Sequence, residues 1–164
     1  MTNQNIGIEF VFPNEAWRLH QHGIEVLASL FHQLSPYRDR PLTAVDFTKL
    51  ADESACFLVA VDYARQGHIV GIARLMVKRD QELRYGEIHD VVVDTAYRHH
   101  GIGRALVEKL IALARLFHLG MVELTSKPAR VAANQLYQKL GFELVEAASP
   151  GVAGSTNRYS LLLT

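Results

Sequence analysis

An arginine and two glycines stand at the junction between a run of valines and a long helical pattern. The junction is Arg98-His99-His100-Gly101-Ile102-Gly103, and beyond it apolar residues recur at the spacing of one helix face through Phe117. The first N–H groups of a helix have no intrahelical partner, and the helix dipole favours negative charge at that end. Glycine lets the backbone turn sharply and lets a bulky group approach the bare amides. The junction therefore predicts an anion-binding turn, with phosphate as the first candidate.

Other functions of such a junction fit these residues less well. Leu106 occupies the place of the third glycine of a dinucleotide-binding G-x-G-x-x-G turn, and the Gly-Lys-Ser/Thr of a P-loop does not occur in the sequence. A metal site at His99 and His100 is not expected, because adjacent side chains diverge and no cysteine or carboxylate cluster completes a ligand set. From these residues alone, a turn that only joins a strand to a helix remains the alternative to a phosphate site.

Three side chains that can take up a proton stand shortly before the junction. Glu87, His89 and Asp90 belong to a predicted strand. Glu87 and His89 would share one face and Asp90 would point to the other, unless a bulge intervenes. Histidine has an unperturbed pKa of about 6.5 against about 4.3 for glutamate, which suits a proton relay at neutral pH. Solvated strand residues or members of ion pairs are the alternative interpretation.

The elements that position these groups alternate between strand and helix patterns. The predicted strands cover residues 6–12, 56–63, 68–78, 84–93, 121–125, 142–146 and 158–163. The predicted helices cover residues 14–34, 43–52, 101–118 and 129–140. Apolar residues occupy both faces of the central strands, so helices should cover both sides. The order predicts an α/β (α+β) fold with a mixed, mostly antiparallel sheet of about seven strands, in which a strand–helix–strand crossover makes one pair parallel.

Length and composition are typical of a single-domain cytoplasmic protein. The 164 residues predict one domain over residues 1–164. Basic and acidic residues each number 17, so no net charge favours nucleic acid or an acidic membrane as a partner. Cys56 is the single cysteine, which excludes an intramolecular disulfide and fits a reducing compartment. The N-terminal segment MTNQNIGIEF lacks a signal-peptide pattern, and no apolar run reaches the ~18–20 residues of a membrane helix.

Two segments of the chain resemble the GNAT superfamily of acetyl-CoA-dependent N-acetyltransferases. Residues 98–103 match the family's signature of Arg or Gln, two residues, Gly, any residue, and Gly or Ala. Residues 91–94 (VVVD) and 104–106 (RAL) are similar to its flanks, and residues 136–142 (LYQKLGF) are similar to its late Leu-Tyr…Gly-Phe motif. The order of elements also resembles this family along essentially the whole chain. The resemblance implies a GNAT-like fold and an acyltransferase that takes acetyl-CoA as its acyl donor and needs no metal.

The resemblance assigns most of the junction to the cofactor. The amides of residues 99–104 would hold the pyrophosphate, and an opened strand edge at residues 91–93 would pair with the pantetheine arm. Asn134 would bond the same arm, although the family's more usual asparagine lies at the position of Arg130. The implied cofactor-binding residues are Val91, Val92, Val93, Arg98, His99, His100, Gly101, Ile102, Gly103, Arg104, Asn134 and Tyr137.

The resemblance also implies an acid and a base. Acetyl transfer to an amine needs a neutral nucleophile, a polarised carbonyl and a proton for the leaving thiolate. The family's tyrosine in the late motif is implicated as the acid, and Tyr137 occupies its position. Glu87 ranks first as the base, because some relatives carry a catalytic glutamate there. His89 ranks second and Asp90 third, where related sugar-phosphate acetyltransferases carry an aspartate. A water molecule held by backbone groups is the alternative base.

The acceptor is less well specified by the sequence. In the family, the acceptor site is bordered by the segments that correspond here to residues 35–44 and 147–157. We expect the primary amine of a small molecule, acetylated by direct attack in a ternary complex. The alternatives are a protein N-terminal or lysine acetyltransferase and a non-catalytic acyl-CoA-binding regulatory module. Homodimers are common in the family, and the residues neither predict nor exclude one here.

Overall fold

The computed structural model describes residues 5–11, 21–35, 43–81 and 83–164. The strands are β1 (Ile6–Phe10), β2 (Cys56–Asp62), β3 (His68–Asp80), β4 (Leu83–Val93), β5 (Met121–Ser126), β6 (Glu143–Glu146) and β7 (Asn157–Leu162). The α-helices are α1 (Gln21–Leu34), α2 (Ala44–Asp52), α3 (Ile102–Leu116) and α4 (Val131–Lys139). The order of elements is the predicted one, and the part of the first predicted helix before residue 21 lies outside the described residues. Among the described helices, none is long and apolar enough to cross a membrane.

Within the described chain, seven strands form one sheet in the order β1-β2-β3-β4-β5-β7-β6. β4 and β5 are parallel, and α3 makes the crossover between them. The remaining neighbours pair in antiparallel fashion. The predicted mixed, mostly antiparallel sheet is confirmed, because a helical crossover leaves consecutive strands parallel and short turns leave them antiparallel.

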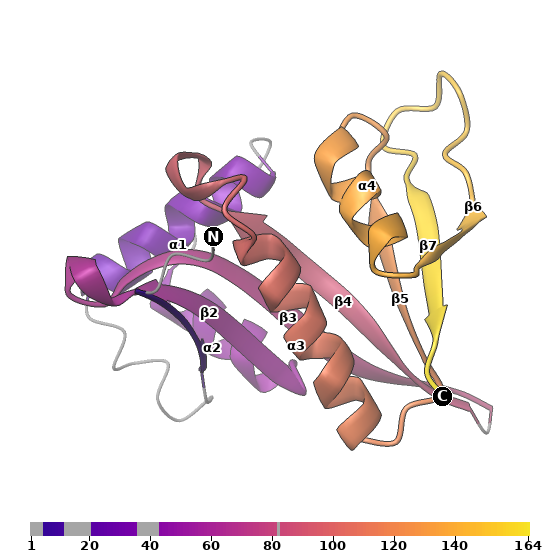
Figure 1. Ribbon diagram of the computed structural model, residues 1–164, viewed down its shortest axis with the longest axis horizontal. Helices are drawn as coiled ribbons and strands as arrows, with labels where there is room; N and C mark the ends of the chain where they lie inside the picture. The colour runs from indigo at the N-terminus through magenta and orange to yellow at the C-terminus, as the bar shows by residue number, and fades with distance from the viewer. Residues whose placement is uncertain (1–4, 12–20, 36–42, 82) are drawn as a thin grey trace.

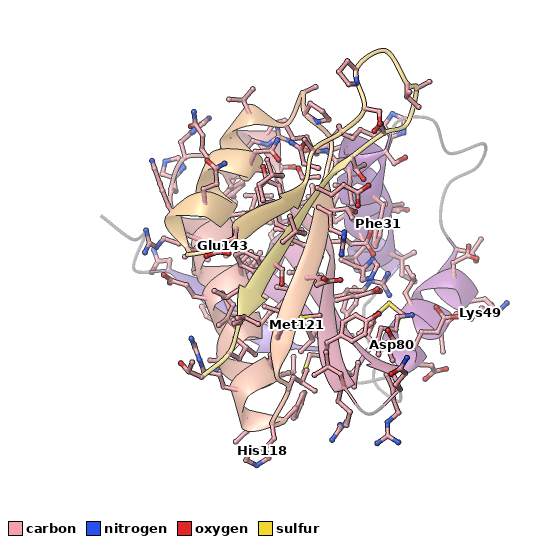
Figure 2. The ribbon with its side chains drawn as sticks, turned by 90° about the vertical axis from the view of Figure 1, so that its right-hand side faces the viewer. Phe31, Lys49, Asp80, His118, Met121 and Glu143 are labelled. Carbon is pink, nitrogen blue, oxygen red and sulfur yellow. The ribbon has the colours of Figure 1, made fainter. Side chains whose placement is uncertain are left out.

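Helices cover both faces of this sheet, and Figure 2 shows it nearly edge-on with α3 and α4 on one side and α1 and α2 on the other. Leu106 and Leu110 of α3 are fully buried on the first side. Leu27 and Leu30 of α1 are fully buried on the second. These residues recur three or four positions apart, so each helix turns one apolar stripe to the sheet.

The strand β2 lies between two apolar cores and is buried along its whole length. Leu58 and Ala60 belong to the core under α3, whereas Phe57, Val59 and Val61 belong to the core under α1. Side chains alternate between the faces of a strand, so a strand covered on both sides needs apolar residues at every position. The apolar run of residues 56–61 is explained by that position.

The helix α2 begins with a capping box. The Thr43 hydroxyl accepts a hydrogen bond from the Asp46 backbone N–H (3.4 Å), and the Thr43 backbone N–H donates to the Asp46 carboxylate (2.8 Å). This reciprocal capping box satisfies donors that the first turn leaves free. It fixes the start of the helix whose other end reaches β3, as described below.

The strands β4 and β5 pair over only a short stretch. Gly86–Ile88 pairs with Val122–Leu124, and beyond it the two strands diverge, as Figure 1 shows. The elements β5, β6, β7 and α4 therefore stand apart from β1–β4 and α1 at one end of the molecule (Figure 1). The second half of β4 is left with one edge facing an opening.

Candidate active site

A β-bulge in β4 marks the place where this strand leaves β5. Ile72 of β3 pairs with Val92, but Arg74 pairs with His89, so two residues of β4 oppose one of β3. Asp90 has a φ of 52°, in the left-handed region that non-glycine residues seldom adopt. The bulge brings its carboxylate to the Arg74 side of the sheet, together with His89. The predicted alternation of faces therefore breaks at Asp90, which was expected to point away only in a regular strand.

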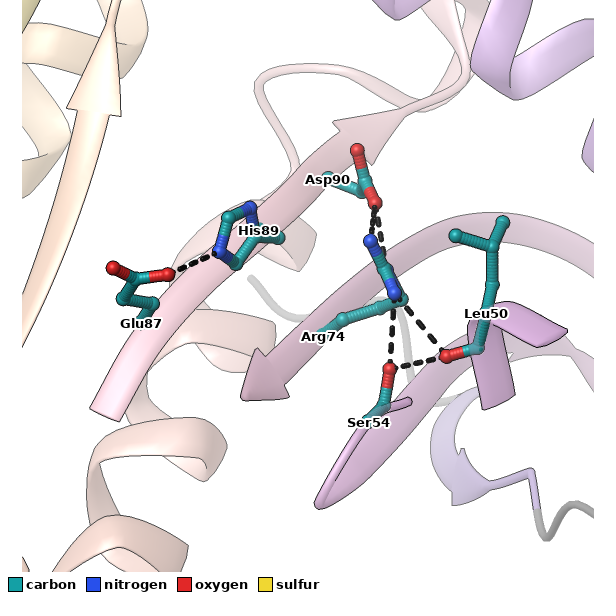
Figure 3. A network of polar contacts seen from close by, with 6 residues as sticks. All are labelled: Leu50, Ser54, Arg74, Glu87, His89 and Asp90. Carbon is teal, nitrogen blue, oxygen red and sulfur yellow. Dashed lines mark hydrogen bonds and ion pairs between the residues drawn. The ribbon is translucent and has the colours of Figure 1, made fainter. Parts of the chain in front are cut away.

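An ion pair between Arg74 and Asp90 holds this bulge (Figure 3). The Arg74 Nε and Nη2 atoms lie 2.6 and 2.5 Å from Asp90 Oδ2. The Arg74 Nη1 atom donates to the Leu50 carbonyl oxygen (3.2 Å) and to Ser54 Oγ (3.1 Å), at the end of α2. Arg74 is only 6% exposed, and a buried charge of this kind requires such partners. Asp90 thus has a structural role, and its action as a base stays a prediction.

The diverging strands open a cleft of about 510 Å³ between β4 and α4. It is lined by Gln33, Leu34, Val91, Val92, Val93, Arg98, Gly103, Ala129, Arg130, Val131, Ala132, Ala133, Leu136 and Tyr137. Most of these side chains are apolar. The edge of β4 that borders the cleft can therefore offer its backbone N–H and C=O groups to an extended, amide-containing ligand.

The helix α3 begins at the mouth of this cleft. Its N-cap residue Gly101 has a φ of 80°, and no side chain caps the helix. A Cβ atom added at Gly103 would lie 3.6 Å from Val93 Cγ2 and 3.8 Å from Leu136 Cδ2, so a side chain there would enter the space between β4 and α4. The free amides of the first turn and the positive end of the helix dipole suit an anionic group at this point.

Gln33 of α1 fastens the loop that precedes α3. Its amide donates to the Asp94 carboxylate (3.2 Å) and accepts from the Thr95 backbone N–H (3.2 Å). Arg98 donates to the Val93 carbonyl (3.0 Å) and to the Gln33 amide oxygen (3.4 Å). Arg98 thus stabilises the strand-to-helix turn from within the cleft. No sequence pattern pointed to Gln33, because it lies far from the motif in the chain.

Three predicted cofactor residues turn their side chains to solvent rather than into the cleft. His99 and His100 are exposed, and the His100 ring contacts the Tyr97 carbonyl (3.3 Å). Arg104 pairs with Glu108 one helical turn later (2.8 Å). Their contribution to binding is therefore limited to backbone amides unless a ligand extends beyond the cleft. Among the described residues, no group of three or more His, Cys, Asp or Glu side chains could hold a metal.

Tyr137 of α4 lies deep in the cleft wall and is only 5% exposed. Its ring packs against Phe142 and Tyr159, each with its centroid 6.0 Å away. Burial raises the pKa of Tyr137 to about 12, while the positive charge of Arg130 acts in the opposite direction. The hydroxyl therefore keeps its proton at neutral pH and can donate it, as an acid must.

The side chain of Asn134, which was predicted to bond the pantetheine arm, forms hydrogen bonds within the protein. Its amide nitrogen donates to the carbonyls of Lys127 (3.0 Å) and Arg130 (2.9 Å), and its oxygen accepts from the Tyr159 hydroxyl (3.0 Å). The side chain therefore ties the start of α4 to β5 and β7 and does not line the cleft. A contact with the cofactor stays a prediction, and Ile102, which is buried in the core, can contribute only its backbone.

A second, smaller hollow of about 120 Å³ lies where β4 and β5 are still side by side. It is lined by Glu87, Ile88, His89, Glu123, Leu124, Thr125 and Arg158. His89 Nε2 lies 3.0 Å from Glu87 Oε2, and Arg158 lies 3.3 Å from Glu123 and 3.3 Å from Glu146. We call this hollow the charged pocket. It contains the two leading base candidates, and Glu123 and Arg158 are members that the sequence did not single out.

The acetyltransferase (GNAT) family model matches residues 16–142. The chain belongs to this family. The chain is thus a GNAT acetyltransferase, as the motif at residues 98–103 indicated. The match covers most of the chain and includes both sequence motifs.

Curated relatives of this GNAT acetyltransferase include N-acetyltransferases of different substrates. N-acetylaspartate synthetase of Xenopus tropicalis is 35% identical over 91 residues, which are 56% of this chain and 32% of that protein. Glucosamine 6-phosphate N-acetyltransferase of Trypanosoma brucei brucei is 34% identical over 112 residues, 65% of this chain and 74% of that protein. The chain spans about a third of the length of the N-acetylaspartate synthetases that it matches.

Solved structures of GNAT acetyltransferases share the fold of this chain. One from Streptococcus pneumoniae has a TM-score of 0.71 at 21% identity and covers 96% of this chain and 99% of its own. An acetyltransferase from Trypanosoma brucei has a TM-score of 0.67 at 26% identity, with coverages of 86% and 94%. A Salmonella typhimurium protein solved with its cofactor acetyl-CoA has a TM-score of 0.75 at 19% identity, with coverages of 98% and 95%. The predicted GNAT-like fold is confirmed.

Proposed function

We propose that this GNAT acetyltransferase moves an acetyl group from acetyl-CoA to the primary amine of a small molecule that also carries an acidic group. The observation that carries the proposal is the arrangement along β4. Val91, Val92 and Val93 border a long, mostly apolar cleft, and Glu87 and His89, a few residues earlier, border a short pocket with both signs of charge. Direct transfer in a ternary complex requires such neighbouring sites for donor and acceptor.

The residues of the cleft fit acetyl-CoA. The open edge of β4 provides backbone groups for an amide-rich arm, and the N-terminus of α3 provides free N–H groups for a pyrophosphate. Gly103 leaves the space between β4 and α4 clear at that point. Arg98 and Arg130 are the charged residues that line the cleft. When bound, acetyl-CoA supplies an acetyl group that is activated as a thioester.

The proton transfers are assigned to residues of both sites. In this proposal Glu87 takes a proton from the acceptor amine, and its hydrogen bond to His89 supports a route for that proton to solvent (Figure 3). Tyr137 donates its hydroxyl proton to the leaving sulfur, and its position in the cleft lining and the raised pKa that keeps it protonated support this role. Glu87 thus acts on the attacking amine, and Tyr137 acts on the leaving thiolate.

The charged pocket supports an acceptor with an amine and an acid group. Glu87 and Glu123 can attract an ammonium group, and the half-buried Arg158 can bind a carboxylate or a phosphate. The two relatives named above are called after N-acetylaspartate and glucosamine 6-phosphate, which are small molecules with an anionic group. The small volume of the pocket favours such a molecule over a polypeptide segment.

A panel of acceptors tests this proposal through the release of thiol from acetyl-CoA. The panel contains aspartate, glucosamine 6-phosphate, their counterparts without an acidic group (asparagine amide and glucosamine), and a peptide with a free N-terminus. We expect turnover with amines that carry an acidic group and much less with their counterparts that lack one. Turnover with the peptide alone would contradict the small-molecule acceptor, and binding of acetyl-CoA without turnover of any amine would favour a regulatory module.

A further inference from the structure

Arg130 reaches across the mouth of the cleft. It precedes α4, and its Nη2 atom donates to the carbonyl oxygen of Leu34, the last residue of α1, at 2.6 Å. Its own carbonyl accepts from the Asn134 backbone N–H (3.0 Å) and from the Asn134 amide (2.9 Å). Both the backbone and the side chain of Arg130 are therefore fixed, and the contact joins elements that stand on either side of the opening in Figure 1.

The charge of Arg130 faces a cleft that contains little to neutralise it. Arg98 is the other charged residue among the described residues that line the cleft, and no described carboxylate lines it. Arg98 is engaged by the Val93 carbonyl and by Gln33 at the loop before α3. The partner of Arg130 is a carbonyl, which carries no net charge. An arginine does not lose its proton at any pH of interest, so the positive charge is permanent.

Tyr137 shares this cleft with Arg130, and the electrostatic influence of the guanidinium extends to its hydroxyl. Burial raises the pKa of Tyr137 to about 12, and the positive charge of Arg130 is the largest influence that lowers it. In a buried, mostly apolar wall, an anion is costly unless a positive charge lies near. The same charge must therefore favour any other anion that forms beside the Tyr137 hydroxyl.

We propose that Arg130 is a positioning residue of acetyl transfer, which stabilises the negative charge that develops at the leaving sulfur and at the Tyr137 oxygen. The inference rests on the function proposed above. In the transfer, the amine nitrogen bonds to the acetyl carbonyl carbon while the carbon–sulfur bond breaks and its electron pair remains on sulfur. The sulfur takes the Tyr137 hydroxyl proton, an amine proton passes to Glu87, and Tyr137 regains a proton from solvent. Arg130 exchanges no proton and acts through its charge.

The test uses the free thiol of CoA as a probe of the local field. Calorimetry measures the affinities for CoA and for desulfo-CoA, which lacks the sulfur, between pH about 6 and about 9, the range in which a thiol ionises. Burial should disfavour the thiolate as it disfavours the Tyr137 anion, and Arg130 should oppose this effect. At the alkaline end of the range, the ratio of the CoA affinity to the desulfo-CoA affinity should therefore be up to about tenfold lower in Arg130→Met than in the wild type, which corresponds to one pKa unit on the thiol. Arg130→Lys should lower this ratio less.

Lys139→Met is the matched control, since it removes a cation from the exposed end of the same helix and should leave the affinity ratio unchanged. An unaltered affinity ratio in Arg130→Met would overturn the role of Arg130, even if acetyl-CoA still binds. Loss of desulfo-CoA binding in Arg130→Met would do the same, because it would mark Arg130 as a purely structural residue. If the wild type binds neither ligand, the proposed function itself fails.

Discussion

The two halves of β4 differ in what they offer a ligand, and in the proposed function they serve the donor and the acceptor by different physical means. Over Val91–Val93 the strand offers backbone groups and apolar side chains to a cleft of about 510 Å³. Around Glu87 and His89 it contributes ionisable side chains to a pocket of about 120 Å³. The bulge at Asp90 separates the two halves. A cofactor common to a whole family can be recognised by backbone geometry, whereas an acceptor must be selected by side chains.

The difference also shows where substitutions should act. In the cleft, the backbone geometry depends on the bulge and on the glycine turn, so residues that hold this geometry control binding. In the charged pocket, each side chain acts directly, so removal of one charge should alter the rate or the choice of acceptor while the fold persists.

Tyr137→Phe should lower the rate of transfer by about 10²–10⁴, the usual contribution of a positioned acid, and leave acetyl-CoA affinity intact. The ring contacts with Phe142 and Tyr159 remain in this variant, so the fold should be kept. Steady-state kinetics and calorimetry measure the two quantities. Tyr159→Phe is the control: it removes a hydroxyl that bonds Asn134 and should reduce stability with little effect on rate. An unchanged rate in Tyr137→Phe would exclude this residue as the acid.

Glu87→Gln should reduce the rate by roughly 100-fold, at the lower end of the range for a general base, because His89 remains in the pocket. The same kinetic assay compares it with His89→Gln. A larger loss in His89→Gln than in Glu87→Gln would reverse the two roles. If both variants retain full activity, a water molecule held by backbone groups is the base and the charged pocket serves only to bind.

Arg74→Met should reduce the free energy of unfolding by about 2–3 kcal/mol, because it leaves Asp90 without its partner. This lies below the usual range for fully buried pairs, since the Asp90 side chain is 22% exposed. Urea unfolding measures the effect, and Asp90→Asn in the same chain should restore part of it. The exposed pair of Arg104 with Glu108 is the control, and Arg104→Met should cost no more than about 1 kcal/mol. If Arg74→Met and Arg104→Met lost the same free energy of unfolding, the Arg74–Asp90 ion pair would contribute no more to stability than an exposed pair.

Arg158→Met should reduce the preference for amines that carry an acidic group over amines that lack one by about tenfold in kcat/KM. This is a low value for the loss of one charge-assisted hydrogen bond. Rates with uncharged amines should change little. The measured quantity is the ratio of the two kcat/KM values in wild type and variant. If this ratio were the same in the wild type and the variant, Arg158 would only pair with Glu123 and Glu146 and would take no part in selection.

The fold and the strand-to-helix turn at the cleft could be predicted because local sequence determines them. Gly101 adopts the positive φ that a sharp strand-to-helix turn requires. The apolar stripe of α3 comes directly after it in the sequence. Tyr137 was found through its motif, and its burial follows from the helix face that it shares with the core. These features need only a few neighbouring residues to be recognised.

The charged pocket and the anchors of the cleft could not be predicted in the same way. Glu123 and Arg158 meet Glu87 only because β5 lies between β4 and β7, which no local pattern reveals. Gln33 and Arg130 similarly join segments far apart in the chain. Arg74 did leave a signal, since a charged residue within the apolar run of β3 requires a buried partner. The face of Asp90 depended on a bulge that alternation alone cannot locate.

The central claim is that the N-terminus of α3 and the neighbouring edge of β4 bind acetyl-CoA, and calorimetric titration tests it most directly. A Cβ atom at Gly103 meets only ordinary contacts, so Gly103→Asp should fold and should place a negative charge where the pyrophosphate is expected. Ala112→Asp, on the exposed face of the same helix, is the charge control. We predict that the wild type and Ala112→Asp bind acetyl-CoA, and that Gly103→Asp binds about thirtyfold more weakly or worse, matching the ~2 kcal/mol that a helix terminus can contribute. Equal affinity in Gly103→Asp and the wild type, or no binding by the wild type, would contradict the claim.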